Sequence, residues 1–206
     1  MRSTYLNLLA LLLLAGLLHS CGEEEEVYLP KPKGFHRIEL PPHEYDPLRQ
    51  KVGDQSFPYQ FDVSRHSKII DDPHFLSQDY WIEIEYPDFN AEIDISYKPI
   101  MNRPDSLQGY LATSHKLTRK HSVRASKIEE FATVAGKNKD LPAVVFELEG
   151  EVPSYFHWYA HDSTQHFVRA ALYFDQAEKA DSLKPIIEYL KVDMMKMLNT
   201  LELEKK

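Results

Sequence analysis

Two neighbouring segments that alternate strictly between apolar and polar residues constrain the fold most. In residues 80–86 and again in residues 89–98, apolar side chains occupy every second position, and Pro87-Asp88 separates the two segments. Such alternation is typical of a strand with one buried face and one solvated face. The sequence therefore predicts an antiparallel hairpin over this region.

The periodicity changes after the hairpin, where apolar residues recur at spacings of three and four. Pro104, Asp105 and Ser106 are typical of a helix start, and such a stripe follows them. A second stripe follows Asp181 and Ser182, which are predicted to cap another helix. A stripe of this kind more often faces the core than a cofactor.

Several further segments are predicted as strands, and their order relative to the helices indicates the fold class. The order is strands, helix, several strands, helix, which predicts antiparallel hairpins with two helices packed on the sheet, the α+β class. Beside the hairpin, the predicted strands are residues 57–63, 126–134, 141–149, 154–161 and 166–174.

The N-terminus is typical of a lipoprotein signal peptide. Arg2 supplies a positive charge, residues 5–18 form an uncharged apolar run, and the single cysteine of the chain is Cys21. The run is shorter than the ~20 apolar residues that a membrane-spanning helix needs. We expect cleavage after Ser20 and acylation of Cys21, with ordinary secretion without lipid as the alternative.

The expected organisation has three parts. Residues 1–20 are the signal peptide, residues 21–55 a lipidated acidic spacer with a proline-rich extended arm, and residues 56–206 one globular domain. Glu23 to Glu26 form a like-charge block, which is typical of a solvated spacer. The same acidic residues also resemble a signal for the outer leaflet of the outer membrane, so both interpretations stay open.

The charge balance and the motif content argue against several functions. The formal net charge is −8 and no basic face is evident, which argues against nucleic acid as a partner. Phosphate-binding glycine loops and serine- or zinc-hydrolase motifs are absent, so we expect neither an enzyme nor a cofactor. Two carboxylate pairs on strand faces, Glu83 with Glu85 and Glu147 with Glu149, are more often solvated than catalytic.

Three histidines of the last predicted hairpin are weak candidates for a metal site. His157 and His161 point to one strand face by the two-residue period. If the turn centres on Ser163 and Thr164, His161 lies opposite His166. Zinc sites normally need three or four ligands, and histidines that face solvent beside a turn are common, so we expect no bound metal.

Aromatic residues offer a candidate surface for a partner or a ligand. Trp81, Tyr155 and Tyr159, with Trp158, contain the large rings that stack on sugars, although such rings more often belong to the core. A lipid-anchored domain that binds glycans or small ligands is therefore the alternative function.

A series of motifs runs in order along nearly the whole chain. The stretches are Leu29-Pro30-Lys31-Pro32-Lys33-Gly34, Phe57-Pro58-Tyr59-Gln60-Phe61, Trp81 to Tyr86 with Pro87, Ala91 to Pro99, Leu117-Thr118-Arg119-Lys120-His121, Asp162-Ser163-Thr164-Gln165-His166-Phe167 and Leu172-Tyr173-Phe174. Together they resemble the GldD family of gliding motility lipoproteins from Bacteroidota.

The resemblance implies a non-enzymatic lipoprotein held at the outer membrane by its lipid, at the periplasmic face or the cell surface. It implies a requirement in gliding motility and type IX protein secretion, with other gliding and secretion lipoproteins and envelope proteins as partners. Only the acylated cysteine carries over as a functional residue, onto Cys21. The strand and helix order is also similar to the Mog1/PsbP architecture, which implies nothing about function.

Overall fold

The computed structural model describes residues 39–49, 51–52, 55–74, 76–174 and 180–205. The described residues belong to one compact unit. The predicted signal peptide, Cys21, the acidic block and most of the arm lie outside the described residues.

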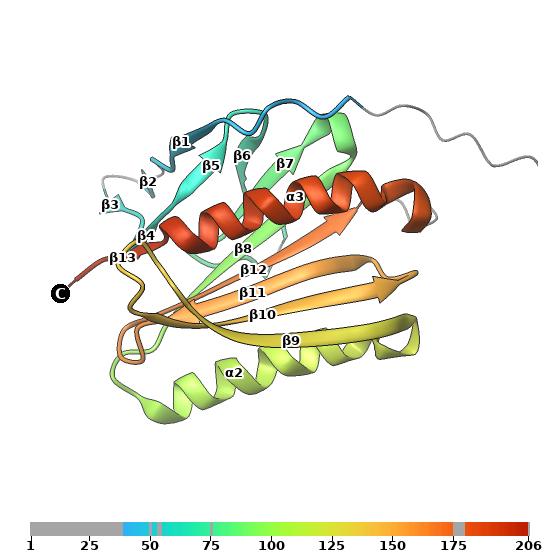
Figure 1. The fold of residues 1–206 in the computed structure, drawn as a ribbon. Helices are drawn as coiled ribbons and strands as arrows, with labels where there is room; N and C mark the ends of the chain where they lie inside the picture. Colours follow the sequence, from blue (N-terminus) through green and yellow to red (C-terminus); the bar gives the residue numbers. More distant parts are fainter. Residues whose placement is uncertain (1–38, 50, 53–54, 75, 175–179, 206) are drawn as a thin grey trace, which may run out of the picture. The chain divides into compact units, whose positions relative to one another are not determined.

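A seven-stranded sheet forms the centre of the described unit, in the order β6-β7-β8-β12-β11-β10-β9, and every neighbouring pair is antiparallel. Figure 1 shows the sheet between two long helices. The strands are β6 (Lys68–Asp71), β7 (Ile82–Tyr86), β8 (Ala91–Pro99), β9 (Ala125–Ala135), β10 (Leu141–Gly150), β11 (Ser154–His161) and β12 (His166–Phe174).

The two helices, α2 (Pro104–Arg119) and α3 (Ala180–Thr200), cover opposite faces of the sheet. The ring of His115 on α2 packs edge-on against Phe146 of β10, whereas Lys191 on α3 bonds to Glu147. Consecutive residues of a strand point to opposite faces. We therefore call these faces of the sheet the α2 face and the α3 face.

The main core lies between the sheet and α3. Alternate residues of the central strands point to α3 because the strands have a two-residue period, and the apolar stripe of α3 meets them. All of these side chains belong to one buried cluster. Its members that are at most 1% exposed include Ile82, Ile84, Tyr86, Ile93, Ile95, Trp158, Ala170, Leu172, Leu190, Met194, Met197 and Leu198.

Short strands from both ends of the described chain lie beside α3. β1 (Tyr45–Pro47) pairs with β5 (Asp62–Ser64), and β13 (Glu202–Leu203) pairs with β4 (Tyr59–Gln60). The remaining elements are β2 (Lys51–Val52), β3 (Gln55–Ser56), which pairs with β2, and two short 3-10 helices, η1 (Pro87–Phe89) and η2 (Lys120–Val123).

The predicted α+β class, with two helices on an antiparallel sheet, is confirmed. The predicted strand over residues 57–63 is wrong, because that segment has two partners: β4 pairs with a strand from the C-terminus and β5 with one from the arm. The predicted start of the domain at Ser56 is also too late. Leu48 is 2% exposed and β1 belongs to the fold, so the arm supplies part of the compact unit.

Candidate functional site

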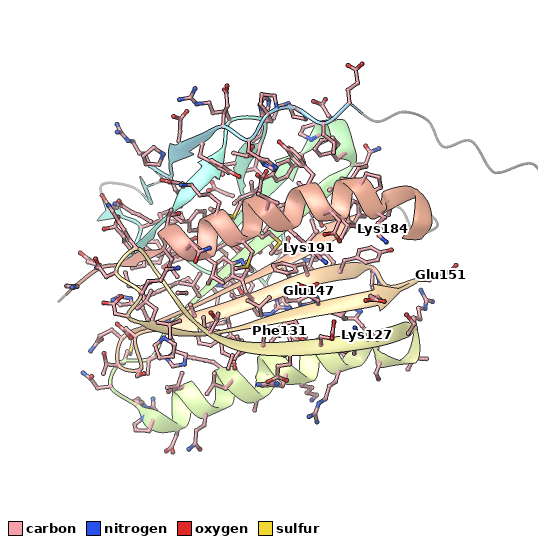
Figure 2. The ribbon with its side chains drawn as sticks, viewed as in Figure 1. Lys127, Phe131, Glu147, Glu151, Lys184 and Lys191 are labelled. Atoms are coloured by element: carbon pink, nitrogen blue, oxygen red, sulfur yellow. The ribbon has the colours of Figure 1, made fainter. Side chains whose placement is uncertain are left out.

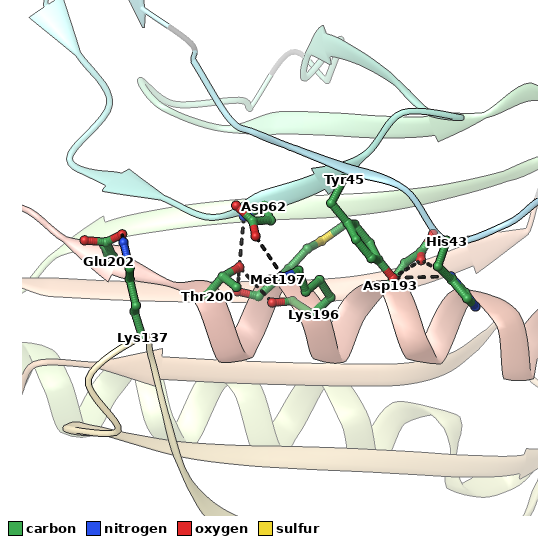
Figure 3. Close-up of polar contacts among 9 residues, drawn as sticks. All are labelled: His43, Tyr45, Asp62, Lys137, Asp193, Lys196, Met197, Thr200 and Glu202. Atoms are coloured by element: carbon green, nitrogen blue, oxygen red, sulfur yellow. Dashed lines mark hydrogen bonds and ion pairs between the residues drawn. The ribbon is translucent and has the colours of Figure 1, made fainter.

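A buried carboxylate joins the N-terminal arm to α3. Asp193 is fully buried, and its Oδ1 accepts hydrogen bonds from Nδ1 of His43 at 2.7 Å and from the hydroxyl of Tyr45 at 2.8 Å. Its Oδ2 accepts a third from the hydroxyl of Tyr86 at 3.0 Å. Figure 3 shows how the arm residues reach this carboxylate across α3.

These contacts make Asp193 a structural group. Burial and the neighbouring Asp193 raise the pKa of Tyr45 and of Tyr86, so both phenols stay protonated and donate. The ring of His43 also stacks on Tyr189, with centroids 4.3 Å apart. A His–Asp pair is part of a serine-hydrolase triad, but no serine, threonine or cysteine of the described residues bonds to His43.

Further along α3, a second set of polar contacts joins the same helix to β5. The amide N–H of Asp62 donates to Oγ1 of Thr200 at 2.9 Å, and the ammonium of Lys196 lies 2.9 Å from the Asp62 carboxylate. Figure 3 shows these contacts beside those of Asp193. These hydrogen bonds and the ion pair hold the arm and β5 against α3.

The predicted metal candidate His157 is buried in a polar cluster on the α2 face. Oγ of Ser154 donates to the carbonyl of Leu172 at 2.5 Å and lies 2.7 Å from Nε2 of His157. Because that hydroxyl has one proton, Nε2–H of His157 must donate to it. Nδ1 then accepts from the guanidinium of Arg169, 2.9 Å away.

This cluster resembles a serine–histidine nucleophile pair but lacks its chemistry. A general base must accept the proton of the hydroxyl, and here His157 donates to Ser154 instead. Both residues are at most 1% exposed. Burial, and then the positive charge of Arg169, lowers the pKa of His157 well below its ordinary value. The imidazole is neutral and holds β11 against β12.

The other two candidate histidines point to different partners. Nδ1 of His161 accepts the amide N–H of Ser163 at 3.1 Å, inside the turn. Nε2 of His166 donates to the carbonyl of Glu204 at 3.0 Å, and its Nδ1 lies 2.9 Å from the Tyr97 hydroxyl. No group of three histidine, cysteine or acidic residues within the described ranges could hold a metal ion.

The expected pairing of His161 with His166 is wrong. His161 pairs with Phe167 instead. The reason lies in Asp162, whose Oδ1 accepts the amide N–H groups of Thr164, Gln165 and His166 at 2.7–2.9 Å. With these hydrogen bonds, the turn contains one more residue than expected. The register between β11 and β12 is therefore shifted by one residue.

The candidate aromatic residues do not form one exposed surface. Tyr155 and Tyr159 are 4% and 5% exposed, respectively. Trp81 is half-buried, its Nε1 donates to the carbonyl of Tyr97 at 2.8 Å, and the ammonium of Lys98 lies 4.6 Å from its ring centroid. These rings are occupied by packing and by neighbouring polar groups.

Four carboxylates gather on the part of the α2 face formed by β7 and β8. Glu83 pairs directly with Asp94 across the strands, and Glu85 pairs with Glu92. Like charges in such positions are destabilising. Burial and the neighbouring carboxylates raise the pKa of Glu83 to about 7 and that of Asp94 to about 6. Perturbed carboxyl groups also occur at functional sites.

The strand β9, with 11 residues, lies at one edge of the sheet. Among the described strands it pairs only with β10. Residues 130–134 are all exposed, and within them Phe131 is 46% and Val134 52% exposed. Phe131 lies opposite Val145 on the α3 face, so Val134 points to the α2 face. Apolar side chains are therefore exposed on both faces of this half of the strand, and Figure 2 shows Phe131 on β9.

A groove adjoins the other half of β9 on the α3 face. It has a volume of about 590 Å³ and lies between α3 and the ends of β9 and β10. Lys184 and Lys191 border it from the helix side (Figure 2). Nζ of Lys191 is already held by Glu147 at 2.8 Å and Glu188 at 3.2 Å.

Sequence reasoning missed the two most informative features, Asp193 and the free edge. Asp193 follows Leu190 by three positions, so its helical phase places an acid on the buried stripe, which is a signal of a specific partner. The sequence of β9 does not indicate that it is a free edge, because the order of strands in a sheet depends on how distant segments pair.

Comparison with known proteins decides the family. Over residues 25–203 the chain matches the sequence model described as gliding motility lipoprotein GldD. The chain belongs to the GldD family. Membership makes it a membrane-anchored lipoprotein, as the resemblance in the sequence implied. None of the curated proteins searched matches the chain.

One solved structure similar to this GldD-family chain is the solution structure of cyanobacterial PsbP (CyanoP) from Synechocystis sp. PCC 6803. The two share 6% sequence identity with a TM-score of 0.40, and the match covers 80% of this chain and 95% of the other. Within the described ranges, no helix is long and apolar enough to cross a membrane.

Proposed function

We propose that this GldD-family protein is a non-enzymatic component of the outer membrane, required for gliding motility and type IX secretion. Its lipid, on Cys21, holds the domain at the membrane, and the domain contributes contacts to other gliding and secretion lipoproteins or envelope proteins. Family membership supports the link to motility.

One observation supports the non-enzymatic role: the candidate polar side chains are buried and hydrogen-bonded, whereas one edge of the sheet is unpaired and exposed. Ser154, His157 and Asp193 are buried and bonded to partners within the fold. By contrast, β9 has no second neighbour among the described strands, and apolar side chains are exposed along it. A protein whose polar groups maintain its fold and whose sheet has a free edge is suited to assembly.

A deletion strain tests this function. We expect it to lose colony spreading and the secretion of type IX substrates, and expect the intact gene in trans to restore both. A second complementing gene should encode His157→Gln, which keeps a hydrogen-bonding side chain but removes the imidazole. Restoration by this variant at wild-type protein levels supports a non-enzymatic role. A deletion strain that spreads and secretes normally would contradict the proposal.

A further inference from the structure

The two edges of the sheet differ in how they are protected. β6, at one edge, has only four residues, and charged Lys68 and Asp71 stand at its ends. β9, at the other edge, has 11 residues. Short length and charge are the usual devices that keep an edge strand from pairing with another chain, and β6 uses both.

Only the first half of β9 has charged residues that protect it from pairing with another chain. Its first half carries Lys127, Glu129 and Glu130, whereas no charged residue occurs in 131–135. The side chains stay exposed beyond Glu130, the last charged residue of β9, since Phe131 and Val134 are 46% and 52% exposed. An edge strand without charges, proline or a covering element offers its unpaired N–H and C=O groups to another strand. The second half of β9 is therefore open to pairing with another chain.

We propose that β9 pairs antiparallel with β9 of a second copy of this chain, around a two-fold axis at Phe131, and so joins two sheets into one. The dimer extends the proposed function. Its biological role rests on that function, whereas the pairing of the two strands does not. The occupant is a second copy because an identical strand can pair in this register without placing like charges opposite each other.

The complementarity follows from antiparallel pairing. With the axis at Phe131, the phenyl rings of the two copies face each other, and no like charges stand directly opposite. An axis at Glu129 or Glu130 would instead place two carboxylates face to face, which is destabilising. The remaining pairs within β9 in the proposed register are Glu130 with Ala132, Glu129 with Thr133, Ile128 with Val134, and Lys127 with Ala135.

Membrane anchoring favours this pairing. Tethered copies share one surface, which raises their effective concentration without any new contact. An interface between identical patches closes as a two-fold dimer, so the free edge is used up and does not continue into a fibre. Two copies joined in this way leave both β6 edges outermost, where short length and charge protect them.

Cysteine cross-linking in intact cells tests the register. Phe131→Cys should give a disulfide-linked dimer on mild oxidation, since directly opposite Cβ atoms lie about 5 Å apart and a disulfide needs about 4 Å. Ile128→Cys and Val134→Cys, co-expressed with different tags, should link to each other. The matched control is Val192→Cys, because Val192 is an exposed apolar residue of similar exposure (48%) on α3.

A charge variant provides the second measurement. Phe131→Glu would place like charges opposite each other at the axis, and we expect the detergent-solubilised lipoprotein to change from dimer to monomer while circular dichroism shows that it stays folded. Val192→Glu should stay dimeric.

Absence of the Phe131→Cys dimer, equal cross-linking at Val192, or cross-linking of Phe131→Cys to a different protein would each overturn self-pairing. These results are independent of the motility phenotype, so the dimer and the proposed function can fail separately.

Discussion

The carboxylate of Asp193 on α3 accepts a hydrogen bond from Nδ1 of His43 at 2.7 Å, although the two residues are 150 positions apart in the sequence. The contact connects the C-terminal helix α3 to the N-terminal arm, which is part of the fold. Because this carboxylate is fully buried, it needs such donors to offset the loss of hydration.

Asp193→Ala should lower the free energy of unfolding by roughly 2–4 kcal/mol, because it leaves the donors of His43, Tyr45 and Tyr86 without their acceptor. Urea denaturation of the purified domain measures the loss. The matched control is Glu188→Gln on the exposed side of the same helix, expected to change stability by less than about 0.5 kcal/mol. A loss for Asp193→Ala as small as the control would show that these contacts do not hold the arm.

Glu83→Gln should stabilise the protein at pH 8 and have less effect at pH 5. Burial and Glu92 raise the pKa of Glu83 from 4.5 to about 7. The folded state thus binds this proton more tightly than the unfolded state. The resulting stability is fully present below about pH 4.5 and is lost as pH rises through 7.

The expected gain of Glu83→Gln at pH 8 is about 1–2 kcal/mol, since one pKa unit corresponds to about 1.4 kcal/mol and partial solvation reduces the effect. Thermal unfolding between pH 5 and pH 8 measures it, with Glu149→Gln as the control, because Glu149 is an exposed residue of β10. A difference between wild type and Glu83→Gln that does not vary with pH would contradict the raised pKa.

His157 should remain neutral and carry its proton on Nε2 as the pH falls through about 6.5, the ordinary pKa of histidine. The reason is the bonding of Ser154 Oγ, which donates to Leu172 and accepts from the ring, together with burial, which lowers the pKa of His157. Nitrogen-15 NMR of the imidazole distinguishes the tautomers. In urea the same ring should titrate near pH 6.5, and an Nδ1–H or a charged ring in the folded protein would refute this arrangement.

Cys21→Ala should release the protein from the membrane fraction, because we propose that the lipid on Cys21 is its anchor. Cell fractionation and labelling with radioactive palmitate measure the change. Ser20→Ala keeps a small residue before the cysteine and should retain both the label and the membrane position. Membrane recovery of Cys21→Ala at the wild-type level would mean that another feature anchors the chain.

Most elements of the fold could be predicted because each depends on a local pattern. The helix starting at Pro104 and the four strands from residue 125 to residue 174 occur close to their predicted positions. The hairpin also forms, although Tyr80 adopts a left-handed φ of 66° and β7 begins at Ile82. Alternation and helical spacing indicate such elements without any knowledge of their neighbours.

The candidate site was predicted less well, because side-chain partners are not local. His161 and His166 were expected to face each other from turn length alone, and the bonding of Asp162 shifted the register. Tyr155 and Tyr159 have aromatic rings of the kind that stack on sugars, yet packing buries both. Burial depends on what lies across the sheet, and the sequence near these residues does not report that.

By itself, the sequence determined the element types, the α+β class, the family resemblance and the candidate anchor at Cys21, because these follow from short-range periodicity and motifs. Only the tertiary structure decided that β9 is a free edge and that Asp193 meets His43. Strand order and buried pairing arise from contacts between distant segments, and the lowest free energy of the whole chain selects them.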